Sequence, residues 1–457
     1  MHFAQSPDAA LPIWCVTPDA LDALIERRCP HAAAFAAAMG FRAEPGRLCV
    51  VPGRDGGLGG ALFGLETAPR RRDPFAAGVL AAMLPAGTWR FEDAPPDPTL
   101  AALGFLLSSY RFTRYRQGDA AAARLCAPAG VDAPRLERIA EAVAMGRDLI
   151  NTPANDLGPD ALEGAITAFA NRHGAQVAIT RGADLKTTNL PLIFAVGQAS
   201  PQAPRLVDFT WGARDAPKVT LVGKGVTFDT GGLDIKPDAA MLLMKKDMGG
   251  AATALALASM IIEAGLAVRL RVLIPVVENA IAGDAFRPGD IYRSRKGLTV
   301  EIGNTDAEGR LILADALALA DEEAPALLLD FATLTGAARV ALGPDLPPFY
   351  CTDDTVAAAI AAHGVSAHDP VWRMPLWEPY DALLKGKISD LNNISSGPFA
   401  GSITAALFLR RFVEHAAAWA HFDVYAWSPS AKPGRPEGGE IQAARLLYDY
   451  IEARFGA

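Results

Sequence analysis

The chain has 457 residues, of which 51% are hydrophobic and 21% are charged, a composition typical of globular proteins and not of disordered or fibrous ones. Its 43 basic and 51 acidic residues leave a net charge of −8, which argues against nucleic acid as the main partner, since phosphate contacts need clustered Lys and Arg. The five cysteines lie far apart without a CxxC pair, so we expect no disulfide framework and a reducing, cytoplasmic compartment.

Residues 1–130 are predicted to form a small N-terminal α/β domain. Three short apolar runs in this part are typical of strands, and they span residues 47–52, 61–66 and 88–93. The apolar spacing of residues 100–115 predicts a helix. Residues 126–134 are rich in Pro, Gly and Ala and predict a linker, after which a long helix begins and ends near Pro153.

Residues 135–457 alternate between strand-like and helical patterns. The predicted strands span residues 176–180, 192–197, 205–211, 218–223, 268–278, 298–303, 326–333 and 419–427. The predicted helices span residues 249–265, 308–323, 401–418 and 439–453. This alternation predicts a larger C-terminal α/β domain with a central mixed sheet covered by helices. The most apolar stretch, residues 251–268, is interrupted by polar side chains and predicts a buried helix, not a membrane span.

Several widespread catalytic motifs are absent from the sequence. It contains no GxxxxGK[ST] phosphate loop, no GxGxxG after a strand, no GxSxG elbow and no HExxH. The seven histidines are scattered, so a zinc site built on His and Cys has no support. The chemistry must therefore be sought among other residue types.

A set of charged residues lies where predicted strands end or predicted helices begin. The set comprises Lys224, Asp229, Asp247, Asp306 and Glu308. In α/β sheets, ligands bind beyond the carboxyl ends of strands, so these segments could converge on one pocket.

Each of these residues also has an ordinary structural interpretation. Residues 305–308 fit a capping box, and Asp247 fits a plain helix N-cap. Residues 229–232 fit a turn, while Lys224 and Lys236 fit solvated surface lysines. Taken singly, these interpretations are favoured. Taken together, they leave unexplained why glycines, which let the backbone approach a bound group closely, crowd the same segments.

Metal chemistry gives a sharper hypothesis. Several carboxylates in one pocket repel one another unless cations offset their charge. A pair of divalent metals does so, and oxygen-rich sites suit manganese, magnesium or zinc. Two metals about 3.5 Å apart can share a hydroxide nucleophile and clamp a tetrahedral intermediate.

Three segments carry a resemblance to a known family: VGKGVTFDTGGLDIKP (222–237), KKDMGGAA (245–252) and NTDAEGRL (304–311). Together they resemble the leucyl aminopeptidase (cytosol aminopeptidase) family, of which NTDAEGRL is the signature. The resemblance covers essentially the whole second part and matches the first part weakly. It implies a catalytic domain over residues 135–457 that hydrolyses the N-terminal residue from short peptides. It also implies a homohexamer whose active sites face an interior cavity.

The resemblance implies two divalent metal ions, manganese or zinc. Asp229 and Glu308 resemble the bridging ligands, and Asp306 resembles a ligand of the looser metal. Asp247 and Lys224 resemble ligands of the tighter metal, for which Lys224 must be a neutral amine.

Two further residues resemble the family's catalytic groups. Lys236 would polarise the scissile carbonyl and stabilise the oxyanion. Arg310 would hold a bicarbonate ion that serves as general base toward the bridging water. The substrate's free α-amine would bind the tighter metal beside Asp247, which accounts for an exopeptidase.

The substrate pocket is also implied by the resemblance. Met244, Thr333, Leu334 and Gly336 fall where the family's S1 wall lies, an apolar slot suited to Leu or Met. Tyr425 stands where the family usually has a small residue, so it either reshapes this pocket or packs elsewhere.

Two alternatives to a peptidase of apolar N-terminal residues remain. Some relatives of the family bind DNA, but the net charge of −8 and the lack of a basic run argue against a nucleic-acid partner here, and the lack of an apolar span argues against a membrane partner. A relative retained for another substrate, such as cysteinylglycine, or as an inert scaffold is the second alternative. An inert scaffold is disfavoured because every site residue is intact.

Overall fold

The computed structural model describes residues 1–5, 9–116 and 123–456, which group into two compact units. The N-terminal unit contains residues 1–144 and 429–437, and the larger unit contains residues 145–428 and 438–457. The predicted linker lies before the helix α5 (Ala133–Asn151), and the units divide within that helix. Residues 429–437 were not expected to return to the N-terminal unit.

The described part of the N-terminal unit contains a five-stranded sheet of order β2-β3-β1-β4-β5. The strands are β1 (Leu11–Val16), β2 (Leu48–Pro52), β3 (Leu58–Gly64), β4 (Gly87–Asp93) and β5 (Ala123–Leu125). The α-helices are α1 (Leu21–Arg28), α2 (Ala33–Ala38), α3 (Leu80–Met83) and α4 (Pro98–Ser108). The 3-10 helices are η2 (Pro18–Ala20), η3 (Pro30–Ala32), η4 (Pro69–Arg71) and η5 (Ala76–Val79). The predicted strands 47–52, 61–66 and 88–93 correspond to β2, β3 and β4.

A nine-stranded mixed sheet forms the centre of the larger unit as described. Its strand order is β15-β14-β17-β13-β8-β10-β7-β6, and β9 pairs with β10. Strands β17, β13, β8 and β10 run parallel. Strand β14 pairs antiparallel with β17 and parallel with β15, and β7 pairs antiparallel with both β10 and β6. The strands are β6 (Gln176–Arg181), β7 (Arg205–Trp211), β8 (Lys218–Gly223), β9 (Gly225–Asp229), β10 (Arg269–Asn279), β13 (Leu327–Ala332), β14 (Pro348–Cys351), β15 (Trp372–Arg373) and β17 (Trp419–Asp423).

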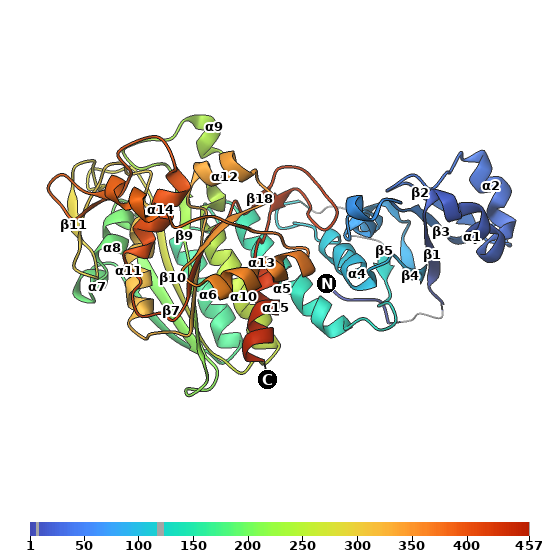
Figure 1. The fold of residues 1–457 in the computed structure, drawn as a ribbon, viewed down its shortest axis with the longest axis horizontal. Coiled ribbons are helices and arrows are strands. Elements are labelled where there is room, and N and C mark those ends of the chain that lie inside the picture. Colours follow the sequence, from blue (N-terminus) through green and yellow to red (C-terminus); the bar gives the residue numbers. More distant parts are fainter. Residues whose placement is uncertain (6–8, 117–122, 457) are drawn as a thin grey trace. The chain divides into compact units, whose positions relative to one another are not determined.

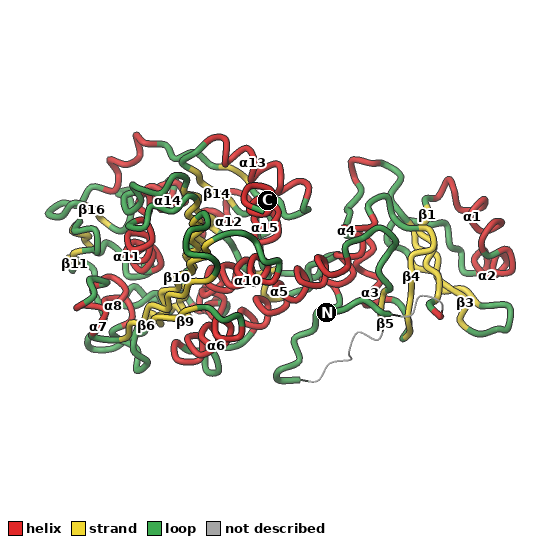
Figure 2. The backbone as a smooth tube through the Cα atoms, turned by 90° about the horizontal axis from the view of Figure 1, so that it is seen from below, coloured by secondary structure: helices red, strands yellow, loops and turns green. Residues whose placement is uncertain are grey.

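Helices cover both faces of this sheet (Figures 1 and 2). Helices α8, α11 and α14 pack together on one face, and α10, α13 and α15 pack together on the other. The helices are α6 (Pro159–Arg172), α7 (Asp184–Thr187), α8 (Pro191–Gly197), α9 (Asp238–Met241), α10 (Gly249–Glu263), α11 (Gly309–Asp321), α12 (Gly336–Leu342), α13 (Asp354–Ser366), α14 (Gly401–Arg410) and α15 (Ala444–Phe455), with the 3-10 helices η6 (Met244–Met248) and η7 (Glu378–Leu384). The predicted fold class is confirmed.

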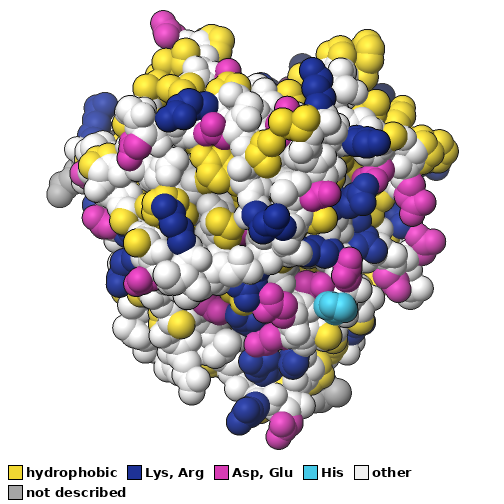
Figure 3. Space-filling model, turned by 90° about the vertical axis from the view of Figure 1, so that its left-hand side faces the viewer, with side chains coloured by type: hydrophobic (Ala, Val, Ile, Leu, Met, Phe, Trp, Pro, Cys, Tyr) yellow, Lys and Arg dark blue, Asp and Glu magenta, His cyan; other side chains and the backbone are white. Residues whose placement is uncertain are grey.

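Smaller elements complete the larger unit. A three-stranded sheet joins β11 (Ile291–Arg293), β12 (Thr299–Glu301) and β16 (Leu391–Asn392), and β18 (Trp427–Ser428) pairs with β19 (Gly438–Gly439). On the face shown in Figure 3, Lys and Arg side chains are interspersed with Asp and Glu side chains.

The predicted strand over residues 192–197 is wrong, because this segment is helix α8. A short apolar run that is buried on all sides has no periodicity to separate strand from helix. Pro191, at the first position of the helix, was the signal that favoured a helix. The predicted helix over 401–418 ends early, at Arg410.

The apolar stretch that begins at Ala251 forms most of α10, whose residues from Gly249 to Ile262 are all buried. This confirms the predicted buried helix, which ends at Glu263, and residues 264–268 connect it to β10. No helix in the described part of the chain is long and apolar enough to span a membrane.

Candidate active site

The charged residues singled out in the sequence line one cavity of about 580 Å³. Lys224 directly follows β8, and Asp229 is the last residue of β9. Asp247 lies on η6, and Asp306 and Glu308 lie in the loop before α11. The predicted convergence is therefore present, and it arises because β8 and β9 end at the same edge of the sheet.

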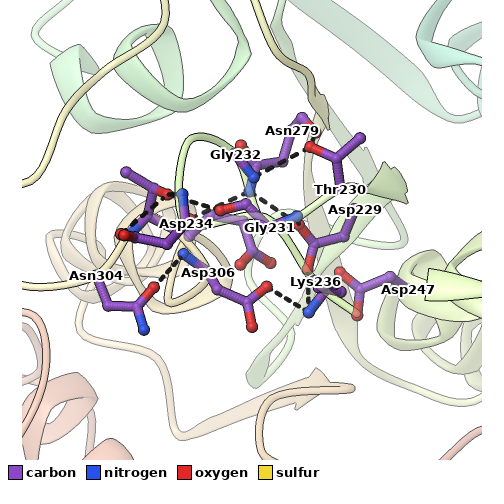
Figure 4. Close-up of polar contacts among 12 residues, drawn as sticks. Asp229, Thr230, Gly231, Gly232, Asp234, Lys236, Asp247, Asn279, Asn304 and Asp306 are labelled. Carbon is purple, nitrogen blue, oxygen red and sulfur yellow. Dashed lines mark hydrogen bonds and ion pairs between the residues drawn. The ribbon is translucent and has the colours of Figure 1, made fainter. Parts of the chain in front are cut away.

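Two lysines bridge the carboxylates in pairs. Lys224 Nζ lies 2.7 Å from Asp247 Oδ2 and 2.8 Å from Glu308 Oε1. Lys236 Nζ lies 2.9 Å from Asp229 Oδ2 and also pairs with Asp306 Oδ1 (Figure 4). Lys224 is 3% exposed, so it is not a solvated surface lysine. We call these residues the carboxylate wall of the cavity.

The carboxylate wall is crowded with negative charge. Burial, followed by repulsion from Asp229, raises the pKa of Glu308 and of Asp306. Burial alone would lower the pKa of Lys224, but attraction to Asp247 and Glu308 outweighs it and raises that pKa. Asp229, Asp306 and Glu308 each offer an oxygen, and these oxygens lie within 4.8 Å of one another. A set of carboxylate oxygens this close together is suited to bind a divalent cation.

The capping-box interpretation of residues 305–308 is wrong. Glu308 occupies the N-cap position of α11, and no side chain caps this helix. Thr305 Oγ1 instead donates to the carbonyl of Gly231 at 2.6 Å and accepts from the N–H of Asp234 at 2.8 Å. Thr305 therefore fastens the loop that carries Asp306 and Glu308 to the loop that carries Asp229.

The N-cap interpretation of Asp247 is wrong as well. The N-cap position of α10 is Met248, which makes no side-chain cap. Asp247 Oδ1 accepts a hydrogen bond from Thr333 Oγ1 at 2.7 Å, and Oδ2 faces Lys224. Both carboxylate oxygens therefore contact side chains that line the cavity, and neither caps the helix.

The turn interpretation of residues 229–232 is correct, but the turn also serves the site. Asp229 Oδ1 accepts from the N–H of Gly231 at 2.9 Å, and Gly231 has φ +87°. The same oxygen accepts from Asn279 Nδ2 at 2.8 Å. Asn279 is fully buried and was missed by sequence reasoning, where its position at the end of a long apolar strand was the available signal.

Gly309 gives Lys224 the space that it occupies. A Cβ atom on Gly309 would lie 2.6 Å from Lys224 Cε and 2.7 Å from its Nζ. Any larger residue would displace the ammonium group from Asp247 and Glu308. The space that Lys224 needs therefore explains why a glycine stands at this position of the signature octapeptide.

Arg310 lines the cavity and is 8% exposed. One of its terminal nitrogens, Nη1, donates to the carbonyl of Asn393 at 2.7 Å. Its Nε has no hydrogen-bond partner among the described residues. Burial lowers the pKa of Arg310 to about 10, which leaves the guanidinium charged near neutral pH.

The five residues predicted for the substrate pocket line the same cavity. They are Met244, Thr333, Leu334, Gly336 and Tyr425. Asp423, at the end of β17, positions the backbone of this predicted substrate pocket. Its carboxylate accepts hydrogen bonds from the N–H groups of Leu334 and Thr335 at 3.0 and 3.1 Å.

Two cations that sequence reasoning missed lie beside Tyr425. Lys246 Nζ is 4.8 Å from the centroid of the Tyr425 ring, and Arg339 Cζ is 5.1 Å from it. Lys246 is 5% exposed, and burial lowers its pKa to about 8. We call Lys246, Arg339 and Tyr425 the cationic wall.

A family model described as the cytosol aminopeptidase family, catalytic domain, matches residues 144–448. A second, described as the M17 aminopeptidase N-terminal domain, matches residues 11–128. The chain belongs to the cytosol aminopeptidase family. This confirms the resemblance inferred from the three motifs and identifies the chain as a peptidase of the hydrolase class.

Individual relatives agree. The crystal structure of a cytosol aminopeptidase from Coxiella burnetii matches with a TM-score of 0.93 and 44% identity over 99% of this chain and 98% of that one. The bottromycin maturation enzyme BotP in complex with Mn matches with a TM-score of 0.86 and 33% identity over 98% of this chain and 100% of that one. A protein of Chlorobium phaeobacteroides named "Probable cytosol aminopeptidase" is 41% identical over 67% of this chain, and the match spans 62% of that relative's length.

Proposed function

We propose that the chain is a metalloaminopeptidase that removes the N-terminal residue from short peptides. The observation that carries this proposal is the convergence of four carboxylates and two lysines in one cavity, within a chain of the cytosol aminopeptidase family. The raised pKa of Glu308 and Asp306 supports it, because a pocket of mutually repelling carboxylates is stabilised by bound cations.

The donor set fits two divalent ions, manganese or zinc. Asp229 and Glu308 would bridge the two ions, and Asp306 would bind the looser one. Asp247 and Lys224 would bind the tighter ion, for which Lys224 must lose the proton that it carries when only carboxylates surround it. When bound, such a pair supplies a hydroxide nucleophile and positive charge near the scissile carbonyl.

The chain's own cations would serve the reaction in different ways. Lys236, held between Asp229 and Asp306, would donate a hydrogen bond to the carbonyl oxygen as negative charge grows there. Arg310, whose Nε has no hydrogen-bond acceptor among the described residues, would hold a bicarbonate ion, and that ion would supply a general base for the attacking water.

The substrate's α-amine would lie beside Asp247, and its first side chain would lie against Met244 and Leu334. Both wall residues are apolar, which favours Leu or Met as the first residue. We further propose that the protein acts in the cytoplasm as a homohexamer, on short peptides and not on nucleic acid or membranes. The interspersed charges of Figure 3 support the exclusion of nucleic acid, which binds single-sign basic patches.

The test is product analysis by mass spectrometry. A Leu-headed hexapeptide is incubated with manganese-loaded protein, and we expect free leucine and the pentapeptide as the first products. The Glu308→Gln variant is the control, and it should yield neither product. Internal cleavage, or equal cleavage by the variant, would contradict the proposal.

A further inference from the structure

The cationic wall is assembled from three separate segments. Lys246 belongs to η6, Arg339 to α12, and Tyr425 follows β17. All three side chains line the cavity, and both cations face the same aromatic ring at 4.8 and 5.1 Å. These distances are within the range of cation–π attraction, so the ring holds two positive charges next to each other.

Neither cation is directly paired with a carboxylate in the described part of the chain, although Asp247 and Asp423 attract Lys246 from a distance. Among the described residues, no carboxylate forms an ion pair with Lys246 or Arg339, and neither side chain makes a hydrogen bond. By contrast, Lys224 and Lys236 each contact two carboxylates in the same cavity. Burying a lysine without a paired anion is costly, and at 5% exposure Lys246 bears that cost.

The position of Tyr425 is fixed by its own turn. Gln442 Oε1 accepts from the N–H groups of Tyr425 and Ala426 at 2.9 and 3.1 Å. Ala426 has φ +57°, a left-handed conformation that costs a residue with a Cβ about 1 kcal/mol. Its methyl group is fully buried, so packing holds this conformation in place. The ring is therefore a rigid support for the two cations.

We propose that Lys246 and Arg339, supported by Tyr425, form a subsite that binds a carboxylate of the substrate. This inference rests on the proposed peptidase function and adds the chemical class of substrate. The arginine offers a planar fork of donors and the lysine a compact charge, both of which match a carboxylate. The carboxylate comes either from an acidic first side chain or from the C-terminus of a dipeptide.

The experiment compares kcat/KM within two isosteric pairs, using manganese-loaded protein. Glu-p-nitroanilide against Gln-p-nitroanilide reports an acidic first side chain. Leu-Gly against Leu-Gly-amide reports the C-terminal carboxylate. We expect a preference of about tenfold for the charged member of one pair, the size of a charge-assisted hydrogen bond. Arg339→Met and Lys246→Met should each remove most of it.

Three controls separate this role from a structural one. Lys246→Arg and Arg339→Lys keep the charge and should retain part of the preference. Lys245 is the neighbouring lysine; its Nζ donates to the carbonyl of Asn151, and the residue does not line the cavity. Lys245→Met should therefore leave the preference for the charged substrate unchanged. Manganese content, measured by elemental analysis, should be unchanged in every variant.

A charge preference that the two Met variants abolish supports the subsite, and the pair that shows it identifies the carboxylate. Cleavage without a charge preference in either pair overturns the subsite and leaves the peptidase proposal intact. Metal loss in Lys246→Met overturns it too, because the lysine would then only balance the carboxylate wall. Cleavage of no substrate overturns the proposed function and the subsite together.

Discussion

The two walls of the cavity balance their charges in opposite ways. In the carboxylate wall, each lysine contacts two carboxylates, and the acidic groups outnumber the basic ones. In the cationic wall, Lys246 and Arg339 contact one aromatic ring and form no ion pair among the described residues. The carboxylate wall would be stabilised by a bound positive charge, and the cationic wall would be stabilised by a bound negative charge.

This difference suits a zwitterionic substrate. A short peptide carries an ammonium group at one end and a carboxylate at the other, and the two walls would orient it along the cavity. Electrostatic complementarity of this kind gives orientation and discrimination more than raw affinity.

Removing the metals should have the largest effect, and it should act through the carboxylate wall alone. Chelation is expected to lower kcat by at least about 10³-fold, because the nucleophile and several kcal/mol of charge stabilisation are lost together. Manganese or zinc should restore activity, followed by hydrolysis of Leu-p-nitroanilide. Full activity in exhaustively metal-free protein would falsify the metal hypothesis.

The next largest effects should distinguish Lys236 from Lys224, the two lysines that each contact two carboxylates. Lys236→Ala is expected to lower kcat by about 10²–10³-fold while both metals stay bound, the usual cost of losing one oxyanion donor. Lys224→Ala should instead lower metal content, since it removes a coordinating atom. Lys224→Arg is the matched control and should also lose metal, because a guanidinium does not deprotonate in proteins. Metal loss in Lys236→Ala with both ions kept in Lys224→Ala would mean that the roles are exchanged.

Blocking the substrate's amine should cost about as much as removing a buried charged contact, roughly hundredfold in kcat/KM. N-acetyl-Leu-Gly against Leu-Gly is the comparison, and release of glycine is the measurement. The effect should persist in Arg339→Met, because the amine faces the other wall. Equal cleavage of the acetylated and the free peptide would contradict the placement of the amine beside Asp247.

The sequence predicted the site residues that lie near the ends of strands. It did not predict features that depend on which side chains become buried in the folded chain. Lys224 and Asp229 were expected to meet because they belong to a set of charged residues that lie where predicted strands end or predicted helices begin, and this convergence is present. Strand β1 was missed, since Pro12 inside its run argues against a central strand. Lys246 gave no signal, because a lysine in KKDM is normally solvated, whereas in the folded chain it is buried and faces the ring of Tyr425.

The smallest expected effect concerns the support of the cationic wall. Gly249 begins α10, and a Cβ atom there would lie 2.2 Å from the Cβ of Ala426. Gly249→Ala should therefore push away the turn that positions Tyr425, at a cost of about 1–3 kcal/mol in the free energy of unfolding. The same variant should reduce the charge preference of the cationic wall while leaving manganese content unchanged.

Ala426→Gly tests whether this collision is the cause. Alone, it should change stability little, because relief of the left-handed conformation, about 1 kcal/mol, offsets the lost burial of one methyl group, about 0.8 kcal/mol. Combined with Gly249→Ala, it removes the colliding atom and should restore most of the lost thermal stability. Additive effects in this double-mutant cycle, measured as shifts in Tm, would show that the two positions do not interact and that something other than α10 holds Tyr425 in place.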